Sequence, residues 1–159
     1  MAMTTKATEF LTRKGIPFSV HAYEYAPDGG KIGLQAAQAI GENPEAVLKT
    51  LMVKVDRKQP VCVIIPSNHK LDLKALAALF GGRNARMIAP EEAQAMTGFQ
   101  VGGISPFGQT EQAPVVIAEQ AMKLDHIYVN AGDRGLVVKI APADAQRAVD
   151  AKVDLISTG

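Results

Sequence analysis

The chain has 159 residues and a net charge of +1, with 47% hydrophobic and 21% charged side chains. This length matches one typical domain, so we expect a single domain over residues 1–159 that buries a hydrophobic core without disulfides or structural metals. The composition excludes a long disordered protein, and no apolar run approaches the ~20 residues of a membrane helix. The amino terminus also lacks a signal-peptide core, so we expect a cytoplasmic protein with no membrane partner.

Apolar spacing predicts the elements of the first half of the chain. A helix that Gly15 ends is predicted from four apolar side chains on one side: Met3, Ala7, Phe10 and Leu11. A strand over residues 18–22, a turn at residues 27–30 and a helix over residues 32–40 follow. Residues 48–55 and 61–65 are rich in β-branched side chains and flank a polar turn, which predicts an antiparallel hairpin at the centre of a sheet.

The second half alternates helices and short strands. Asp72 is a candidate N-cap for a helix over residues 73–80, and Pro90 opens a further helix that ends near Gly98. Strands are predicted over residues 85–88, 115–118, 126–130 and 136–140, and Pro142 starts a last helix. The fold class is therefore α/β (α+β), with a mixed β-sheet closing into a barrel-like core and helices packed outside.

Basic residues gather in the middle of the chain. Between residues 46 and 90 there are eight Lys and Arg residues but only two acidic ones, which gives this segment +6 and leaves −5 for the rest. Such asymmetry fits either a basic face for a polyanion or a chance distribution of solvated charges.

Common catalytic signatures are absent from the sequence. His21, His69 and His126 are far apart, and the single cysteine, Cys62, lies in an apolar run, so we expect no metal and no cofactor. No nucleophile elbow, phosphate-binding loop or dinucleotide fingerprint is present. Any catalysis is therefore expected to use backbone donors and substrate positioning.

Lys49 is the most informative side chain. Strand alternation puts it on the apolar face with Leu51, Val53 and Val55. A lysine there must reach the strand end, pair with an acid, or meet an anionic or carbonyl-bearing ligand at the rim of the core.

Two glycine-rich segments are further candidates. The first contains Gly102 and Gly103, which either leave backbone N–H groups open to a ligand or allow tight packing. The second is residues 132–135, which are expected to form a hairpin turn. Tyr23 either walls a pocket or caps the sheet.

Several short motifs occur in order from about Thr5 to the carboxyl end of the chain. The most specific are Lys49-Thr50-Leu51 and Gly102-Gly103-Ile104-Ser105-Pro106. The others are Ile16-Pro17-Phe18, His21, Tyr23, Leu71-Asp72-Leu73-Lys74, Gly108, Ile127-Tyr128-Val129 and Arg134-Gly135-Leu136. Together these motifs resemble the YbaK/EbsC family of Cys-tRNA(Pro) deacylases. The wider superfamily includes the editing domain of bacterial prolyl-tRNA synthetases, and the resemblance implies the barrel-like core described above.

The resemblance implies removal of cysteine mischarged onto tRNA(Pro). In this branch the cysteinyl thiol attacks its own ester and a cyclic thiolactone is released, so no protein nucleophile is needed. Lys49 would hold the terminal adenosine or ester oxygens, and Gly102 and Gly103 would present backbone to the aminoacyl carbonyl. The remaining implied substrate-binding residues are Tyr23, Thr50, Ile104, Ser105, Pro106 and Arg134. The implied partners are the tRNA(Pro) acceptor end and prolyl-tRNA synthetase.

Two segments depart from the usual family pattern. Residues 130–133 read Asn-Ala-Gly-Asp where relatives often carry Ser-Gly-Gly-Lys, and residues 67–70 are a polar loop. Deacylation of alanyl or seryl esters therefore stays open, as does a non-catalytic module that binds tRNA ends or a synthetase.

Overall fold

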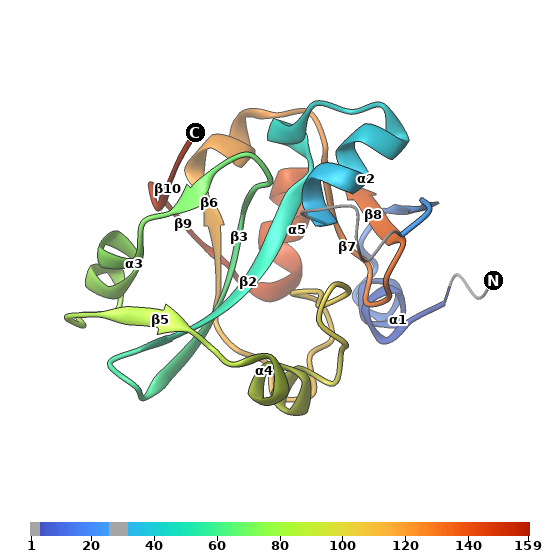
Figure 1. Ribbon diagram of the computed structural model, residues 1–159. Coiled ribbons are helices and arrows are strands. Elements are labelled where there is room, and N and C mark those ends of the chain that lie inside the picture. Colours follow the sequence, from blue (N-terminus) through green and yellow to red (C-terminus); the bar gives the residue numbers. More distant parts are fainter. Residues whose placement is uncertain (1–3, 26–31) are drawn as a thin grey trace.

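The computed structural model describes residues 4–25 and 32–159 of the chain (Figure 1). Met3 and the turn predicted at residues 27–30 lie outside the described residues. Within the described residues, no helix is long and apolar enough to cross a membrane.

A five-stranded mixed sheet forms the centre of the molecule, with β2 (Leu48–Val55) and β3 (Gln59–Pro66) as its antiparallel middle pair. On one side β5 (Ala85–Met87) pairs antiparallel with the last part of β2. On the other side β6 (Val115–Ala118) pairs parallel with β3, and β9 (Lys152–Asp154) pairs parallel with β6. The hairpin predicted over residues 48–65 is thereby confirmed.

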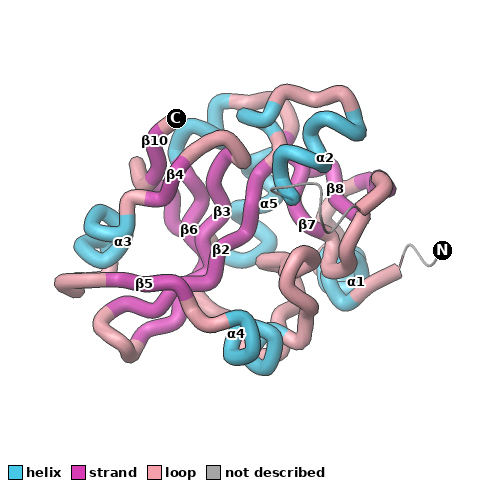
Figure 2. The backbone as a smooth tube through the Cα atoms, in the orientation of Figure 1, coloured by secondary structure: helices cyan, strands magenta, loops and turns pink. Residues whose placement is uncertain are grey.

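Two smaller sheets flank the central one (Figure 2). One is antiparallel, with β8 (Leu136–Ile140) between β1 (Ser19–Ala22) and β7 (Ile127–Asn130). The other pairs β4 (Lys70–Leu71) with β10 (Ser157–Thr158).

The expected closed barrel is wrong. Among the described residues, no sheet closes on itself, because the first small sheet meets the β2 region through a single bridge, between Val47 and Tyr128. The hydrogen-bonded ladder stops at this bridge, so the two sheets stay separate, and their apolar side chains contribute to one shared core cluster.

The helices cover these sheets as amphipathic stretches. They are α1 (Lys6–Arg13), α2 (Ile32–Ile40), α3 (Leu73–Leu79), α4 (Pro90–Thr97) and α5 (Pro142–Val149), with short 3-10 turns η1 (Pro44–Ala46) and η2 (Glu119–Lys123). Asp72 caps α3 by accepting the Ala75 N–H at 3.0 Å, as its sequence position predicts. Pro90 and Pro142 stand at the first positions of α4 and α5.

Strand alternation divides the buried side chains of the central sheet between two cores. Val61, Val63 and Ile65 of β3 pack with Leu76 of α3. Cys62 lies on the opposite face of β3, and the residues of that face pack against α5, α1 and the first small sheet. Both faces of β3 are therefore apolar, which is typical of a strand that is covered on both sides.

Candidate active site

The first part of β2 has one open edge. β5 pairs only with Val53, Lys54 and Val55, so the edge at residues 48–51 has no hydrogen-bonded strand partner in the described part of the chain. A pocket of about 290 Å³ lies there. Its lining comes from α2, the start of β2, the β3–β4 loop, the glycine segment and the β7–β8 hairpin: Ala36, Val47, Leu48, Lys49, Thr50, Leu51, Ser67, Val101, Gly102, Ile104, Asn130 and Val137.

Lys49 and Thr50 reach this pocket from opposite faces of β2. Leu51, Val53 and Val55 pack in the α3-side core, so strand alternation puts half-buried Lys49 on the same face as these residues. The Thr50 hydroxyl is buried and has no hydrogen-bond partner within the described residues. A buried hydroxyl without a partner is costly, and a ligand in the pocket would satisfy it.

Tyr23 lies behind the pocket wall. Its ring packs with Ala36, Val47 and Val137, which all line the pocket, and only 7% of the residue is exposed. Its hydroxyl is also buried without a partner among the described residues. Burial raises the pKa of Tyr23, so the hydroxyl keeps its proton at neutral pH and can donate a hydrogen bond.

The two adjacent glycines of the glycine segment have different surroundings. Gly102 lines the pocket with φ at 96°, a conformation suited to glycine, and its N–H has no acceptor among the described residues. Gly103 is buried, and its N–H donates to the Gln100 carbonyl at 2.9 Å. Of the two expected backbone donors, only Gly102 is thus open at the pocket, whereas Gly103 serves close packing.

We expect Gly103→Ala to destabilise the protein. The added Cβ would lie 2.8 Å from the Asp133 carbonyl carbon and 2.9 Å from the Arg134 nitrogen, and both are backbone atoms. Overpacking of this kind costs about 1–3 kcal/mol, measurable by denaturant unfolding. Gln100→Ala is the control, because Gln100 is an exposed residue of the same segment and accepts the Gly103 N–H through its backbone carbonyl, which the substitution keeps. Unchanged stability of Gly103→Ala would contradict the close packing.

Ile104, Ser105 and Pro106 follow in the same segment, and only Ile104 lines the pocket. The Ser105 hydroxyl accepts the Phe107 N–H at 3.1 Å, and the Pro106 carbonyl accepts the Gln112 amide at 3.0 Å. Both residues are buried, so they shape the segment from beneath rather than contacting the pocket.

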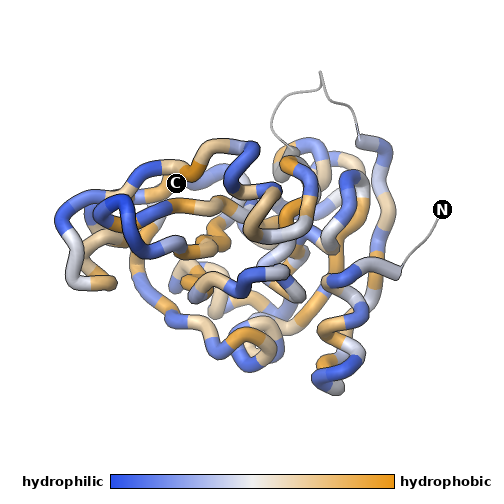
Figure 3. The backbone as a smooth tube through the Cα atoms, turned by 90° about the horizontal axis from the view of Figure 1, so that it is seen from below, coloured by the Kyte–Doolittle hydropathy of each residue, from blue (hydrophilic) through white to orange (hydrophobic). Residues whose placement is uncertain are grey.

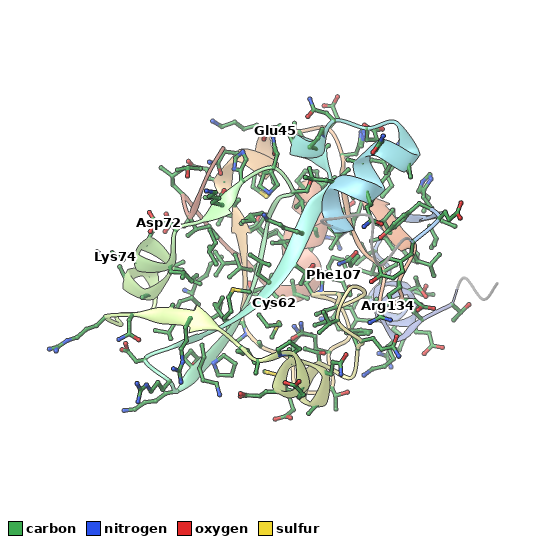
Figure 4. The ribbon with its side chains drawn as sticks, in the orientation of Figure 1. Glu45, Cys62, Asp72, Lys74, Phe107 and Arg134 are labelled. Atoms are coloured by element: carbon green, nitrogen blue, oxygen red, sulfur yellow. The ribbon has the colours of Figure 1, made fainter. Side chains whose placement is uncertain are left out.

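Arg134 lies next to the pocket wall rather than in the lining. Its Nε donates to the Val101 carbonyl at 2.9 Å, and its guanidinium stands 5.5 Å from the centre of the Tyr25 ring. Figure 4 places Arg134 at the end of the molecule opposite α3. Its contact ties the β7–β8 hairpin to the glycine segment, and the predicted turn at residues 132–135 is confirmed by the antiparallel pairing of β7 with β8.

Three polar or small lining residues were not singled out as site residues from the sequence. Ala36 comes from α2, Asn130 from the end of β7, and Ser67 from the loop after β3. Ser67 is held by a hydrogen bond from its hydroxyl to the Pro44 carbonyl at 3.0 Å. The polar character of the 67–70 loop was a weak signal for Ser67, but nothing local marks Ala36.

The histidines and the cysteine lie in separate environments. His69 contacts Ser157 at 2.9 Å and Glu45 at 3.1 Å, while His126 lies 3.5 Å from Glu42. The described residues contain no group of three or more His, Cys, Asp or Glu side chains placed to hold a metal. Burial raises the pKa of the Cys62 thiol to about 12, so it stays protonated and is a poor nucleophile at neutral pH.

Comparison with known proteins identifies the family. The aminoacyl-tRNA editing domain model matches residues 28–148, a span that contains all of the pocket-lining residues. The chain belongs to this family. The resemblance to YbaK/EbsC proteins is thereby confirmed.

Two curated relatives and one solved structure extend the comparison. EbsC of Enterococcus faecalis, provisionally named a Cys-tRNA(Pro)/Cys-tRNA(Cys) deacylase, is 32% identical over 87% of this chain and 84% of its own length. ProXp-y of Escherichia coli K12, named a multifunctional Ser/Thr-tRNA deacylase, is 28% identical over 82% of this chain and 80% of its own. A crystal structure described provisionally as a trans-editing enzyme for prolyl-tRNA synthetase superposes with a TM-score of 0.85, at 22% identity, over 99% of this chain and 100% of its own.

Proposed function

We propose that this member of the editing-domain family is a trans-editing deacylase that removes cysteine from mischarged tRNA(Pro). The observation that carries the proposal is the pocket at the open edge of β2. It combines a cation at Lys49, an unpartnered hydroxyl at Thr50 and an open backbone N–H at Gly102, as seen within the described residues.

The pocket is small enough to favour a small aminoacyl group on the terminal ribose. At about 290 Å³ it is near the lower end of ligand pockets, and Ala36, Leu48 and Ile104 give it apolar walls. Hydrogen-bond donors at Thr50 and Gly102 would orient the ester carbonyl, and Lys49 would offset negative charge that develops on the ester oxygens.

The chemistry would come from the substrate. The cysteinyl sulfur attacks its own ester carbonyl carbon, the bond to the ribose oxygen breaks, and the thiol proton passes to that oxygen. The products are a cyclic thiolactone and a tRNA with a free terminal hydroxyl. This route requires the protein to position the substrate and does not require a protein nucleophile. It agrees with the burial and protonation of the Cys62 thiol.

Seryl, threonyl and alanyl esters are the alternative substrates. The similarity to ProXp-y and the polar groups of Ser67 and Asn130 at the pocket favour hydroxylated aminoacyl groups as the second candidate.

The test is ester loss from purified cysteinyl-, alanyl-, seryl- and threonyl-tRNA, with each tRNA alone as the control for spontaneous hydrolysis. We expect cysteinyl-tRNA(Pro) to be cleaved fastest. If the seryl or threonyl ester is cleaved fastest, the protein is a deacylase for hydroxylated aminoacyl groups and the proposed preference for cysteine is wrong. If none of the esters is cleaved, the protein is a non-catalytic module that binds tRNA or a synthetase.

A further inference from the structure

The far end of β2 carries a group of cations that the pocket does not use. They lie on the last part of β2, the β2–β3 turn, the loop before β5 and β5 itself, and are called the basic end here: Lys54, Arg57, Lys58, Arg83 and Arg86. In Figure 1 these elements extend to the lower left, away from α2, and in Figure 3 the loops at this end are largely hydrophilic.

The backbone holds these cations together. Lys54 and Arg86 are direct partners on adjacent strands, so their side chains start from neighbouring positions on one face. The Asp56 carboxylate accepts the N–H groups of Arg83 and Asn84, each at 3.0 Å, which ties the loop before β5 to the hairpin. These backbone hydrogen bonds lower the pKa of Asp56, so the tie persists at neutral pH.

Asp56 balances part of this charge, because its carboxylate interacts electrostatically with Arg83 and Lys58. Arg57, Lys58, Arg83 and Arg86 are exposed, and none has an ion pair among the described residues. Of the five cations, Lys54 is paired, with Glu92 of α4. Like charges on facing strand positions oppose folding, so their collection here favours an anionic partner.

Arg57 adds a conformational observation. Asp56 and Arg57 lie in the β2–β3 turn, and both have positive φ, at 51° and 62°. Hairpin turns with two positive φ values favour the residue pair Asn-Gly. An arginine is strained in this conformation, so its presence at the tip is not explained by the turn itself.

A hollow beside β5 lies within the basic end, and its lining includes the Glu92 carboxylate that pairs with Lys54, so Arg86 is the lining cation without an ion pair among the described residues. The volume of the hollow is about 230 Å³, and Lys54, Arg86 and Glu92 line it together with Met87, Ile88 and Ala89. Lys74, on the outer side of α3 in Figure 4, adds a further exposed cation at this end of the molecule.

The hollow and the pocket lie toward opposite ends of β2, and buried Met52 lies between them on the face that carries Thr50 and Lys54. Thr50 and Lys54 lie on the same face because they are four positions apart in the strand, and strand geometry puts them ~14 Å apart. At ~3.4 Å per stacked nucleotide this span corresponds to about four nucleotides, the length of the single-stranded 3′ end of a tRNA.

We propose that the basic end binds the sugar-phosphate backbone of the acceptor stem of the tRNA whose 3′ end enters the pocket. This inference rests on the proposed function. The pocket then selects the aminoacyl group, while the basic end provides affinity for RNA without reading its sequence.

The test compares a variant carrying Arg57→Gly, Arg83→Ala and Arg86→Ala with a control that removes three exposed cations elsewhere. The control substitutions are Arg13→Ala, Lys123→Ala and Lys152→Ala. Binding of uncharged tRNA is measured against salt concentration, and deacylation is measured on cysteinyl-tRNA and on a cysteinyl ester of the 3′-terminal tetranucleotide.

We expect the Kd of the basic-end variant for tRNA to rise about tenfold or more at ~0.1 M salt. The logarithmic salt slope should fall by ~0.7 to 0.9 for each phosphate that the variant no longer neutralises, while cleavage of the tetranucleotide ester stays unchanged. Unchanged binding, an equal loss of affinity in the control, or an equal loss of activity on the tetranucleotide overturns the inference.

Two further points separate this inference from the proposed function. Binding of uncharged tRNA needs no catalysis, so a wild-type protein without deacylase activity would refute the function and still allow this test.

If the triple variant does not fold, Arg57→Gly alone carries the test, because glycine fits the left-handed turn. That single change should weaken tRNA binding and raise the melting temperature, a combination that a purely structural role of Arg57 would not produce.

Discussion

Replacement of Lys49 by alanine is expected to lower kcat/KM for cysteinyl-tRNA(Pro) by about 10²–10³-fold while leaving the fold intact. Lys49 is half-buried at the open edge of β2 and lines the pocket, so its removal takes a cation from the place where the ester oxygens would lie. Truncation also relieves the desolvation of a cation on an apolar strand face, which offsets the contact that Lys49 loses, so the melting temperature should hardly change. Deacylation rates and thermal unfolding measure the two effects separately.

The control for this substitution is Lys152→Ala, which removes an exposed strand lysine from β9 on the opposite edge of the central sheet. Lys49→Arg should recover part of the activity because it keeps the charge with a different shape. If Lys49→Ala cleaves at the wild-type rate, Lys49 is a surface lysine that reaches solvent, and the catalytic role belongs to other lining residues.

Blocking the cysteinyl sulfur of the substrate by alkylation is expected to abolish release of the aminoacyl group. A thiol held against its own ester reacts with an effective molarity on the order of 10⁵ M or more, and an alkylated sulfur cannot attack. Alanyl-tRNA(Pro), which has no such nucleophile, should be cleaved far more slowly even when it binds comparably. Ester loss and the detection of thiolactone measure the outcome.

The protein's own thiol provides the control. Cys62 is fully buried in the central sheet and lines no part of the pocket, so Cys62→Ser should leave the rate of ester cleavage unchanged. If alanyl-tRNA(Pro) reacts as fast as the cysteinyl form, the reaction uses a positioned water, and the substrate-thiol route is refuted.

Local sequence patterns were sufficient for the longer elements. Residues 48–55 carry enough β-branched and alternating side chains to specify β2, and Asp72 marks the start of α3. β4, β9 and β10 were missed because they are two or three residues long, and β9 and β10 have mostly polar sequences. Such strands exist only because a partner strand, β6 in the case of β9, supplies the hydrogen bonds.

Sheet closure was beyond the reach of the sequence. Strand number and helix placement are compatible with a barrel, but closure depends on whether the start of β2 continues its ladder into β7. The single bridge between Val47 and Tyr128 decides against it.

By itself, the sequence predicted part of the lining of the candidate pocket and indicated the family resemblance. Lys49 was identifiable because a charge on an apolar strand face breaks the local pattern, and the motif around Gly102 because adjacent glycines leave the backbone accessible. Only the tertiary structure decided which of these groups converge. It placed Gly102 at the pocket and Gly103 against Asp133, and it brought Ala36, Ser67 and Asn130 to the same site from distant segments. The physical reason is that packing between elements depends on long-range contacts, for which neither a lone alanine nor a lone asparagine carries a local signal.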